Sequence, residues 1–269
     1  MRLKLTLQAY QNTIPINYQH FLSSAIYNYL ATSNKNFATN LHNGKHFING
    51  KNFKFFTFSW LQFPKKQIIN FSIKINSPEF YWYISSSWNE FVQNLVNGLL
   101  ELGGLRIGQY NFPITQTETL SSVVGGLNKF ICLSPIVVTT KKEYKGKLDK
   151  YYYKATDNPE EISEKIRQNL INKYTTFFGK EPNDTALKIE FDKNYIKTLK
   201  AQVLSHYIKD DLDIKIPAIM CPFTAAGSSE LIKFGYECGF GELNSAGFGM
   251  VRVIKWKIIN NQNQKHKLK

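Results

Sequence analysis

The sequence has few cysteines. Cys132, Cys221 and Cys238 are the only three, they lie far apart, and no two of them have the spacing of a metal-binding or redox pair. An odd count also argues against a disulfide framework. We therefore expect buried free thiols in a reducing cytoplasm, and we predict no metal site and no cofactor.

Long hydrophobic runs are also missing. No run reaches the roughly 18 apolar residues that a membrane-spanning helix needs. The N-terminus, MRLKLTLQAY, alternates polar and apolar residues, whereas a signal peptide would have an apolar block. We therefore predict a protein with no membrane partner.

Acidic residues are too few to balance the basic ones. The chain has 34 lysine and arginine residues against 20 aspartate and glutamate residues, a formal net charge of +14. Such an imbalance favours polyanionic partners such as nucleic acid or an anionic membrane face, although a merely soluble basic protein would show it too.

The order of elements predicts two similar halves. Residues 2–9 alternate as a strand with one buried face, and residues 20–31 have the apolar spacing of a helix. A short helix over 34–41, capped by Ser33, follows. Strands are then expected at 53–60, 68–75 and 79–84, a helix from a capping box at Ser87 and Glu90 to Gly103, and a strand at 105–114.

The second half repeats this plan after a polar, glycine-containing link at 115–129. We expect a strand from Phe130, and a helix from Pro159 to Phe178 that is capped by Asn158 and stopped by Gly179. Further strands are expected at 186–192, 200–207, 213–223 and 248–257, and a helix at 229–238.

Both halves fit β-α-β-β-α-β, so the fold class predicted is α+β with two tandem ferredoxin-like (RRM-like) domains. The predicted domains are 1–118 and 127–257, followed by a basic tail at 258–269. RNA-binding variants of this fold stack bases on exposed aromatics, which makes Phe56, Phe58 and Trp60 candidates. Phe53 and Phe55 alternate with them, however, and a strand that is apolar on both faces is more simply a buried one.

Glycine is concentrated in one stretch near the end of the chain, GFGELNSAGFG at 239–249. Glycine permits positive φ and close backbone approach, and exposed N–H groups in such a loop can hold phosphate oxygens. Gly239, Gly241, Gly247 and Gly249 are therefore candidate RNA-binding positions. An ordinary helix stop explains Gly239 but not all four.

The segment LIKFGYECGFGELNSAGFGMVRV resembles the C-terminal glycine-rich signature of the CRISPR-associated endoribonucleases that process precursor CRISPR RNA. These enzymes belong to the repeat-associated mysterious protein superfamily. The likeness extends to AIYNYLATSN with the NLH that follows, to VNGLL and to LSPIVV, so it touches both halves. It implies two ferredoxin-like domains, in agreement with the order of elements above.

The resemblance implies RNA cleavage without a metal ion. The ribose 2′-OH attacks the adjacent phosphorus and leaves a 2′,3′-cyclic phosphate and a 5′-OH, which needs a base, an acid and a cation. Histidine is the natural proton carrier near neutral pH. His42 follows Leu41 as in the family, and it lies where the carbonyls at a helix end favour a protonated ring. We predict His42 as the general acid, with His46 as the alternative.

The resemblance assigns the base to Tyr27, which lies off the apolar stripe of its predicted helix. A free phenol has a pKa near 10, so Tyr27 either ionises in its site or orients the 2′-OH. Lys54 is the predicted phosphate clamp. The loop at 43–52 is longer than the family pattern, which leaves Lys51 and Lys45 as alternatives and as predicted RNA contacts.

A basic, tyrosine-rich stretch after the first strand of the second half is predicted to position RNA through phosphate contacts and stacking. A flexible charged hairpin is an equally good interpretation. Its residues are Lys141, Lys142, Lys145, Lys147, Lys150, Tyr144, Tyr151, Tyr152 and Tyr153.

The sequence thus predicts a metal-independent endoribonuclease with CRISPR repeat RNA as its partner. The alternative is a catalytically idle repeat-RNA-binding protein or effector-complex subunit of the same superfamily. The sequence leaves open whether the chain forms a homodimer or joins an effector complex.

Overall fold

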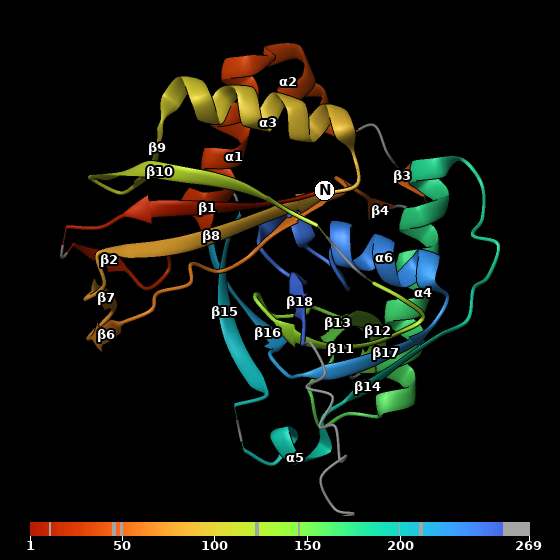
Figure 1. Cartoon of the computed structure of the whole chain (residues 1–269). Helices are drawn as coiled ribbons and strands as arrows, with labels where there is room; N and C mark the ends of the chain where they lie inside the picture. The colour runs from red at the N-terminus through yellow and green to blue at the C-terminus, as the bar shows by residue number, and fades with distance from the viewer. Residues whose placement is uncertain are drawn as a thin grey trace, which may run out of the picture.

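The computed structural model describes residues 1–10, 12–44, 47–48, 51–121, 124–144, 146–198, 200–209 and 212–254. Its two main sheets are antiparallel and lie in different layers, each with helices packed against it (Figure 1). No helix in these described ranges is long and apolar enough to cross a membrane.

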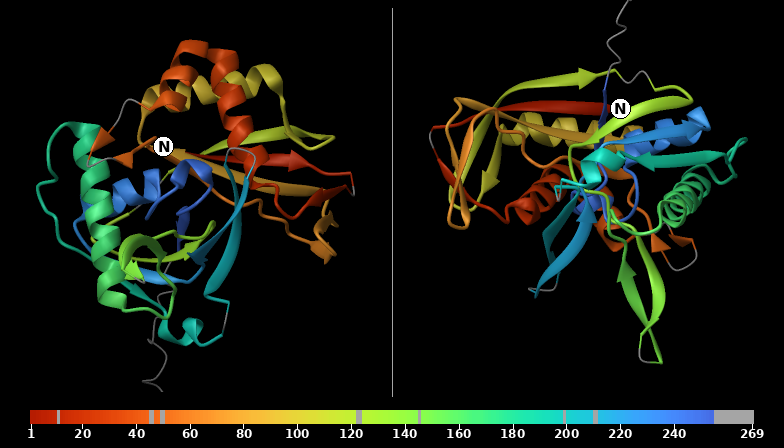
Figure 2. Two further views of the ribbon diagram at one scale, coloured as in Figure 1. Left: turned by 180° about the vertical axis from the view of Figure 1, so that it is seen from behind. Right: turned by 90° about the horizontal axis from the view of Figure 1, so that it is seen from below.

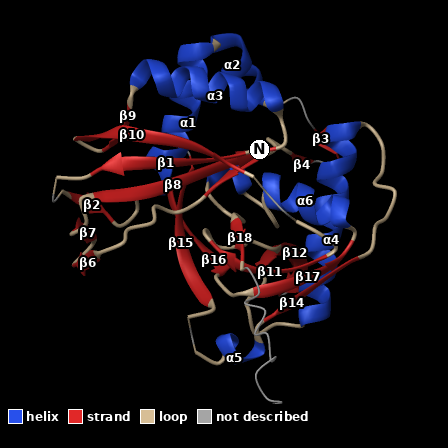
Figure 3. Ribbon diagram, in the orientation of Figure 1, coloured by secondary structure: helices blue, strands red, loops and turns tan. Residues whose placement is uncertain are grey.

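The first sheet has the strand order β5-β8-β1-β10-β9, and all its pairs are antiparallel. Helices α1 (Gln19–Ser33), α2 (Lys35–Asn43) and α3 (Asn89–Leu102) lie on one side of it (Figure 3). In chain order, strands β1, β5, β8 and β10 with helices α1 and α3 form a ferredoxin-like β-α-β-β-α-β unit. Its strands are β1 (Arg2–Gln8), β5 (Phe56–Phe58), β8 (Glu79–Ser86), β9 (Gly104–Ile107) and β10 (Tyr110–Leu120).

The second sheet has the order β14-β17-β11-β18, which is the same arrangement of first, second, third and fourth strands. Helices α4 (Pro159–Phe178) and α6 (Ser229–Cys238) supply the two crossovers. The strands are β11 (Leu127–Cys132), β14 (Leu187–Phe191), β17 (Phe223–Gly227) and β18 (Val251–Val253). The predicted fold class, two tandem ferredoxin-like domains, is confirmed.

Smaller elements project from these two units (Figure 2). Strands β2 (Thr13–Pro15), β6 (Lys66–Ile69) and β7 (Ser72–Ile75) form a small sheet, and β3 (Phe47–Ile48) pairs with β4 (Lys51–Asn52). Two hairpins belong to the second half: β12 (Thr139–Tyr144) pairs with β13 (Lys147–Tyr152), and β15 (Gln202–Lys209) pairs with β16 (Leu212–Ile219). This half also contains the short helix α5 (Lys193–Ile196) and the 3-10 turn η1 (Asn244–Ala246).

The structure corrects several predicted boundaries. The single strands predicted at 68–75, 105–114 and 213–223 are each two strands. The first two turn at Asn70 and Gly108, whose φ angles are 52° and 59°. The link between the sheets is shorter than predicted, because β10 runs to Leu120 and β11 begins at Leu127.

Two predicted helix caps are wrong, and three helix-end signals are confirmed. The Ser87 hydroxyl donates to Glu237 instead of capping α3, and Asn34 rather than Ser33 caps α2 by accepting from the Phe37 N–H. The Asn158 side chain accepts from the N–H groups of Glu160 and Glu161, and Gly103 and Gly179 end their helices with left-handed backbone. Their signals are local, so they can be identified from sequence.

Two cores meet along residues 53–58. Phe56 and Phe58 are fully buried in the core of the first unit, whereas Phe53 and Phe55 pack into the core of the second. The backbone of Phe55 has a φ of 54°, a conformation that non-glycine residues adopt rarely. It lets adjacent phenylalanines enter different cores. The interpretation of Phe56 and Phe58 as core residues is confirmed.

A buried arginine links the two units. The Arg2 guanidinium is 2% exposed and donates from Nη1 to the carbonyl of Val251 at 2.6 Å and from Nη2 to that of Tyr236 at 2.7 Å. It also lies 3.7 Å from the centre of the Tyr236 ring. Burial lowers the pKa of Arg2 to about 10, so the group stays charged at neutral pH. Strand β1 is thereby tied to α6 and β18.

Candidate functional site

Three of the residues singled out in the sequence lie together although they come from three different elements. The Lys54 Nζ donates a hydrogen bond to the Tyr27 hydroxyl at 2.8 Å. The His42 ring packs edge-on against the Tyr27 ring, with the two centroids 5.5 Å apart at 77°. Tyr27 thus contacts both a cation and a proton carrier.

Local structure explains how α1 and α2 bring Tyr27 and His42 together. Leu22, Ile26 and Tyr29 of α1 face the core, which leaves Tyr27 half-buried at the edge of this face. The chain bends at Asn34, whose extended backbone separates α1 from α2. His42 stands exposed in the last turn of α2, as predicted from sequence.

Lys54 owes its position to its neighbours. Phe53 and Phe55 are held in the second core and Phe56 in the first, so the lysine between them is held where the two units meet. Lys54 is half-buried, and the loss of water around its ammonium group lowers the pKa of Lys54 below the usual lysine value.

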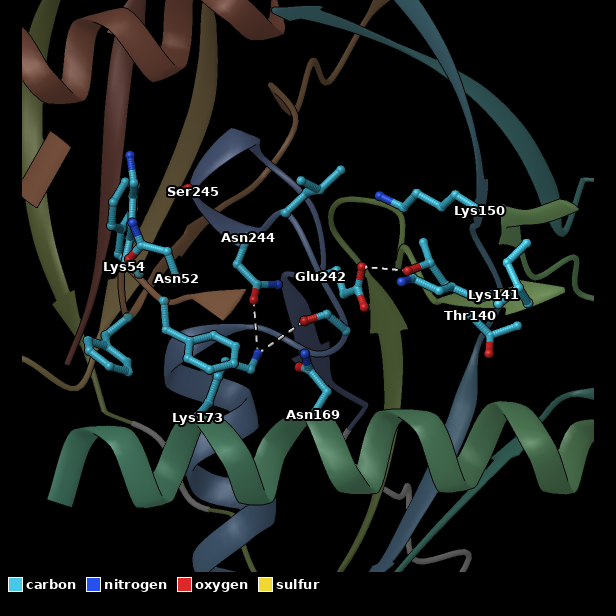
Figure 4. A pocket seen from close by; sticks show the side chains of 17 residues that line it. Asn52, Lys54, Thr140, Lys141, Lys150, Asn169, Lys173, Glu242, Asn244 and Ser245 are labelled. Carbon is cyan, nitrogen blue, oxygen red and sulfur yellow. Dashed lines mark hydrogen bonds between the residues drawn. The ribbon is translucent and has the colours of Figure 1, made fainter. Parts of the chain in front are cut away.

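A cavity of about 500 Å³ lies between the two units, and Lys54 is on its wall (Figure 4). The opposite wall comes from the β12–β13 hairpin, and α4 and the glycine-rich loop close the remaining sides. This loop also reaches α1, where the Ser23 hydroxyl donates to the Ser245 carbonyl at 3.1 Å, one helical turn before Tyr27. The glycine-rich loop therefore lies beside the helix that carries Tyr27.

Lys173 is an important residue of this region that sequence reasoning did not identify. It is 2% exposed, and its ammonium donates to the carbonyls of Gly239 and Gly241 at 2.5 and 3.2 Å. It also donates to the Asn244 side chain at 2.9 Å (Figure 4). A buried lysine must have such partners. No signal in the sequence separates it from the other lysines, because its partners lie more than 60 residues further along the chain.

The glycines pack against neighbouring backbone and side chains. All four are buried and have positive φ. The N–H groups of Gly239, Gly247 and Gly249 donate to the carbonyls of Gly235, Asn244 and Pro135. These three N–H groups are therefore engaged within the protein, which corrects the prediction that they form an exposed cradle for phosphate. Contacts between RNA and other groups of the loop stay a prediction.

Added Cβ atoms would show how closely the glycines are packed. A Cβ on Gly241 would lie 2.4 Å from the Val137 carbonyl oxygen, and one on Gly247 would lie 2.5 Å from the Phe58 ring. These distances are far below van der Waals contact. The glycine signature thus joins the second unit to β5 of the first.

The alternative site residues of the 43–52 loop are only partly covered by the described residues. Lys45 and His46 lie outside these residues. The backbone of Lys51 pairs with Phe47–Ile48 as part of β4, but the description does not extend to its side chain. Their predicted contacts with RNA stay predictions.

The basic hairpin presents charge toward the cavity. Lys141 and Lys150 are directly opposite each other across β12 and β13, both are exposed, and both line the cavity. Like charges at paired positions of a hairpin repel each other. A bound anion would relieve this repulsion, so the two lysines suit an anion site. Tyr153 is 2% exposed and its hydroxyl donates to Glu161, so the prediction that it stacks on bases is wrong.

In the ranges that the structure describes, His, Cys, Asp and Glu side chains form no group of three able to hold a metal ion. Cys221 and Cys238 are buried and Cys132 is partly buried, all three as free thiols. Burial raises the pKa of the Cys132 thiol to about 12. These thiols are therefore protonated at neutral pH.

Comparison with known proteins adds independent evidence. The family model described as CRISPR-associated protein Cas6, N-terminal, matches residues 13–118, and that described as CRISPR associated protein Cas6, C-terminal, matches residues 121–253. A curated protein of Methanocaldococcus jannaschii named CRISPR-associated endoribonuclease Cas6 1 is 38% identical over 270 residues, covering 100% of this chain and 98% of the relative.

Two solved structures have the same fold over nearly the whole chain. A structure titled as the characterization of a Cas6-related gene from Pyrococcus furiosus superposes with a TM-score of 0.78 at 30% identity, covering 95% of this chain and 98% of that one. A structure titled as an RAMP protein binding different RNA substrates has a TM-score of 0.77 at 27% identity, covering 95% and 100%. The matches to both halves, the full-length identity and the shared fold show that this chain belongs to the Cas6 family of CRISPR-associated proteins.

Proposed function

We propose that this protein is an endoribonuclease that cuts CRISPR repeat RNA without a metal ion, leaving a 2′,3′-cyclic phosphate and a 5′-OH. The observation that carries the proposal is the contact of Tyr27 with Lys54 on one side and His42 on the other. Relatives named as CRISPR-associated endoribonucleases support the same activity.

Each side chain has a role that fits its surroundings. The hydrogen bond from Lys54 fixes the Tyr27 hydroxyl, so Tyr27 can align the ribose 2′-OH or accept its proton. The half-buried Lys54 ammonium stabilises the negative charge of the phosphorane, since a cation acts most strongly where water is partly excluded. His42 is exposed in the last turn of α2 beside the Tyr27 ring, and it delivers the proton to the leaving 5′ oxygen.

The test uses 5′-labelled CRISPR repeat RNA of the source organism, incubated with purified protein in EDTA. We expect cleavage at one position and a labelled product that ends in a 2′,3′-cyclic phosphate. His42→Ala should lower the single-turnover rate by about 10²–10⁴-fold, the usual contribution of a general acid, while RNA binding persists. His20→Ala is the matched control, because His20 lies on α1 with its Nδ1 at 2.8 Å from the Asn17 carbonyl.

Other outcomes distinguish the alternatives. Tight and specific binding without cleavage would indicate a catalytically idle repeat-RNA-binding protein. Loss of cleavage in EDTA, restored by a divalent cation, would contradict the metal-independent mechanism. If His46→Ala abolishes cleavage and His42→Ala does not, the general acid is His46.

A further inference from the structure

Asn169 has a buried amide oxygen, Oδ1, that accepts no hydrogen bond from the described residues. The residue lies on α4, one turn before Lys173, and is 7% exposed. A buried amide oxygen that has lost its hydrogen bonds to water without gaining a partner is unfavourable, so its presence needs an explanation.

Asn169 lines the same cavity as Lys54. Figure 4 shows Asn169 rising from α4 beside Lys173, into the space bounded by Lys54 and the β12–β13 hairpin. The volume of about 500 Å³ lies within the range of small-molecule sites, which is about 300–1,000 Å³. The cavity is therefore large enough for one nucleotide.

Apolar and charged groups divide the walls. The exposed Leu148 side chain contributes apolar surface to one wall, and the buried Phe53 and Phe55 lie behind it. On the other side, Lys141 and Lys150 place two positive charges at paired positions of the hairpin. One cavity thus combines an apolar wall, an amide with unused hydrogen-bonding capacity and paired cations, which are the groups that a base and its phosphate require.

We propose that this cavity binds a single unpaired nucleotide of the RNA, next to the scissile phosphate, and that Asn169 reads the edge of its base. The lysine pair holds the phosphate of the same nucleotide. Reading the base requires the amide to turn so that the buried Oδ1 faces the cavity. Its donor and acceptor then lie side by side and match the N–H donor and ring-nitrogen acceptor of adenine. The position of the nucleotide relative to the cut rests on the proposed function; the base pocket itself does not.

Asn169→Leu tests the pocket, because leucine has a similar shape and no hydrogen-bonding groups. Since the Asn169 Oδ1 has no partner in the described protein, the substitution should leave the melting temperature unchanged or raise it. Binding of repeat RNA with a 2′-deoxy nucleotide at the cut should weaken about tenfold or more. Asn172→Leu is the control, because Asn172 is on α4 but does not line this cavity.

A scan of abasic sites identifies the nucleotide. Abasic substitutions are placed singly on either side of the cut, and the binding of each RNA to wild type and to Asn169→Leu is measured. At one position, the abasic RNA should bind wild type as weakly as the intact RNA binds Asn169→Leu. Combining this abasic site with Asn169→Leu should weaken binding no further, because both changes remove the same contact.

Three results would overturn the pocket: unchanged binding by Asn169→Leu, a flat abasic scan, or losses that multiply at every position. A fall in the melting temperature of Asn169→Leu by several degrees would show a structural role instead. The binding assay does not depend on cleavage, so the pocket can stand if the nuclease activity fails, and the activity can stand if the pocket fails.

Discussion

Gly249→Ala should destabilise the protein much more than Gly103→Ala, although both residues have positive φ. The φ angles are +79° and +63°. A Cβ on Gly249 would lie 2.0 Å from the Phe240 carbonyl oxygen, whereas a Cβ on Gly103 would have no atom within 4 Å. The two substitutions therefore share the backbone penalty and differ in the clash.

The magnitudes follow from these two terms. An alanine with left-handed backbone costs roughly 1–2 kcal/mol, which is the expected loss for Gly103→Ala. Forcing an extra carbon into packed structure adds about 1–3 kcal/mol, so Gly249→Ala should lose about 2–5 kcal/mol. At about 2–4 °C per kcal/mol in a protein of this size, its melting temperature should fall by roughly 4–20 °C.

Thermal unfolding followed by circular dichroism, together with urea titration, measures both variants. Equal losses for Gly249→Ala and Gly103→Ala would refute the reasoning, because they would show that the loop can move away from the added carbon. In that case the glycines would be retained for something other than close packing.

Three further predictions concern stability. Arg2→Met leaves the carbonyls of Val251 and Tyr236 without their donor and should lower the free energy of unfolding in urea by about 2–5 kcal/mol. Arg106→Met, at an exposed position, should lower it by less than about 0.5 kcal/mol. Equal losses would contradict the link between the units through Arg2. Asn158→Ala should lower the free energy of unfolding by about 0.5–2 kcal/mol through loss of the α4 cap, and an unchanged midpoint would count against the cap. Burial lowers the pKa of Lys54, so between that pKa and 10.5 the unfolded chain holds the additional proton and the stability contributed by Lys54 rises with pH. The melting temperature of Lys54→Met minus that of wild type should therefore decrease from pH 7 to pH 10, and a constant difference would show that Lys54 is not desolvated.

Much of the fold could be predicted because its signals are local. The alternation in β1, the Asn158 cap and the stops at Gly103 and Gly179 depend on residues a few positions apart. The turns at Asn70 and Gly108 were missed because each lies within a run that otherwise continues as a strand, and Gly108 carried the signal of an interruption.

The candidate site was less predictable because it depends on packing between distant segments. The contact of Tyr27 with His42 is set by the bend at Asn34, and the position of Lys54 depends on the left-handed backbone of Phe55. The contacts of Lys173 with the glycine loop could not be read from sequence, since nothing local marks a lysine as buried. Resemblance to a family supplied the roles that spacing alone did not.

The division of neighbouring phenylalanines between two cores has a consequence for how the protein can be activated or inhibited. Lys54 reaches Tyr27 only while Phe53 and Phe55 are seated in one half and Phe56 in the other. Any ligand or substitution that separates the two halves would move the Lys54 ammonium away from the Tyr27 hydroxyl before either half unfolds. With the roles proposed for Lys54 and Tyr27, cleavage would then be lost at a temperature or denaturant concentration below that of global melting.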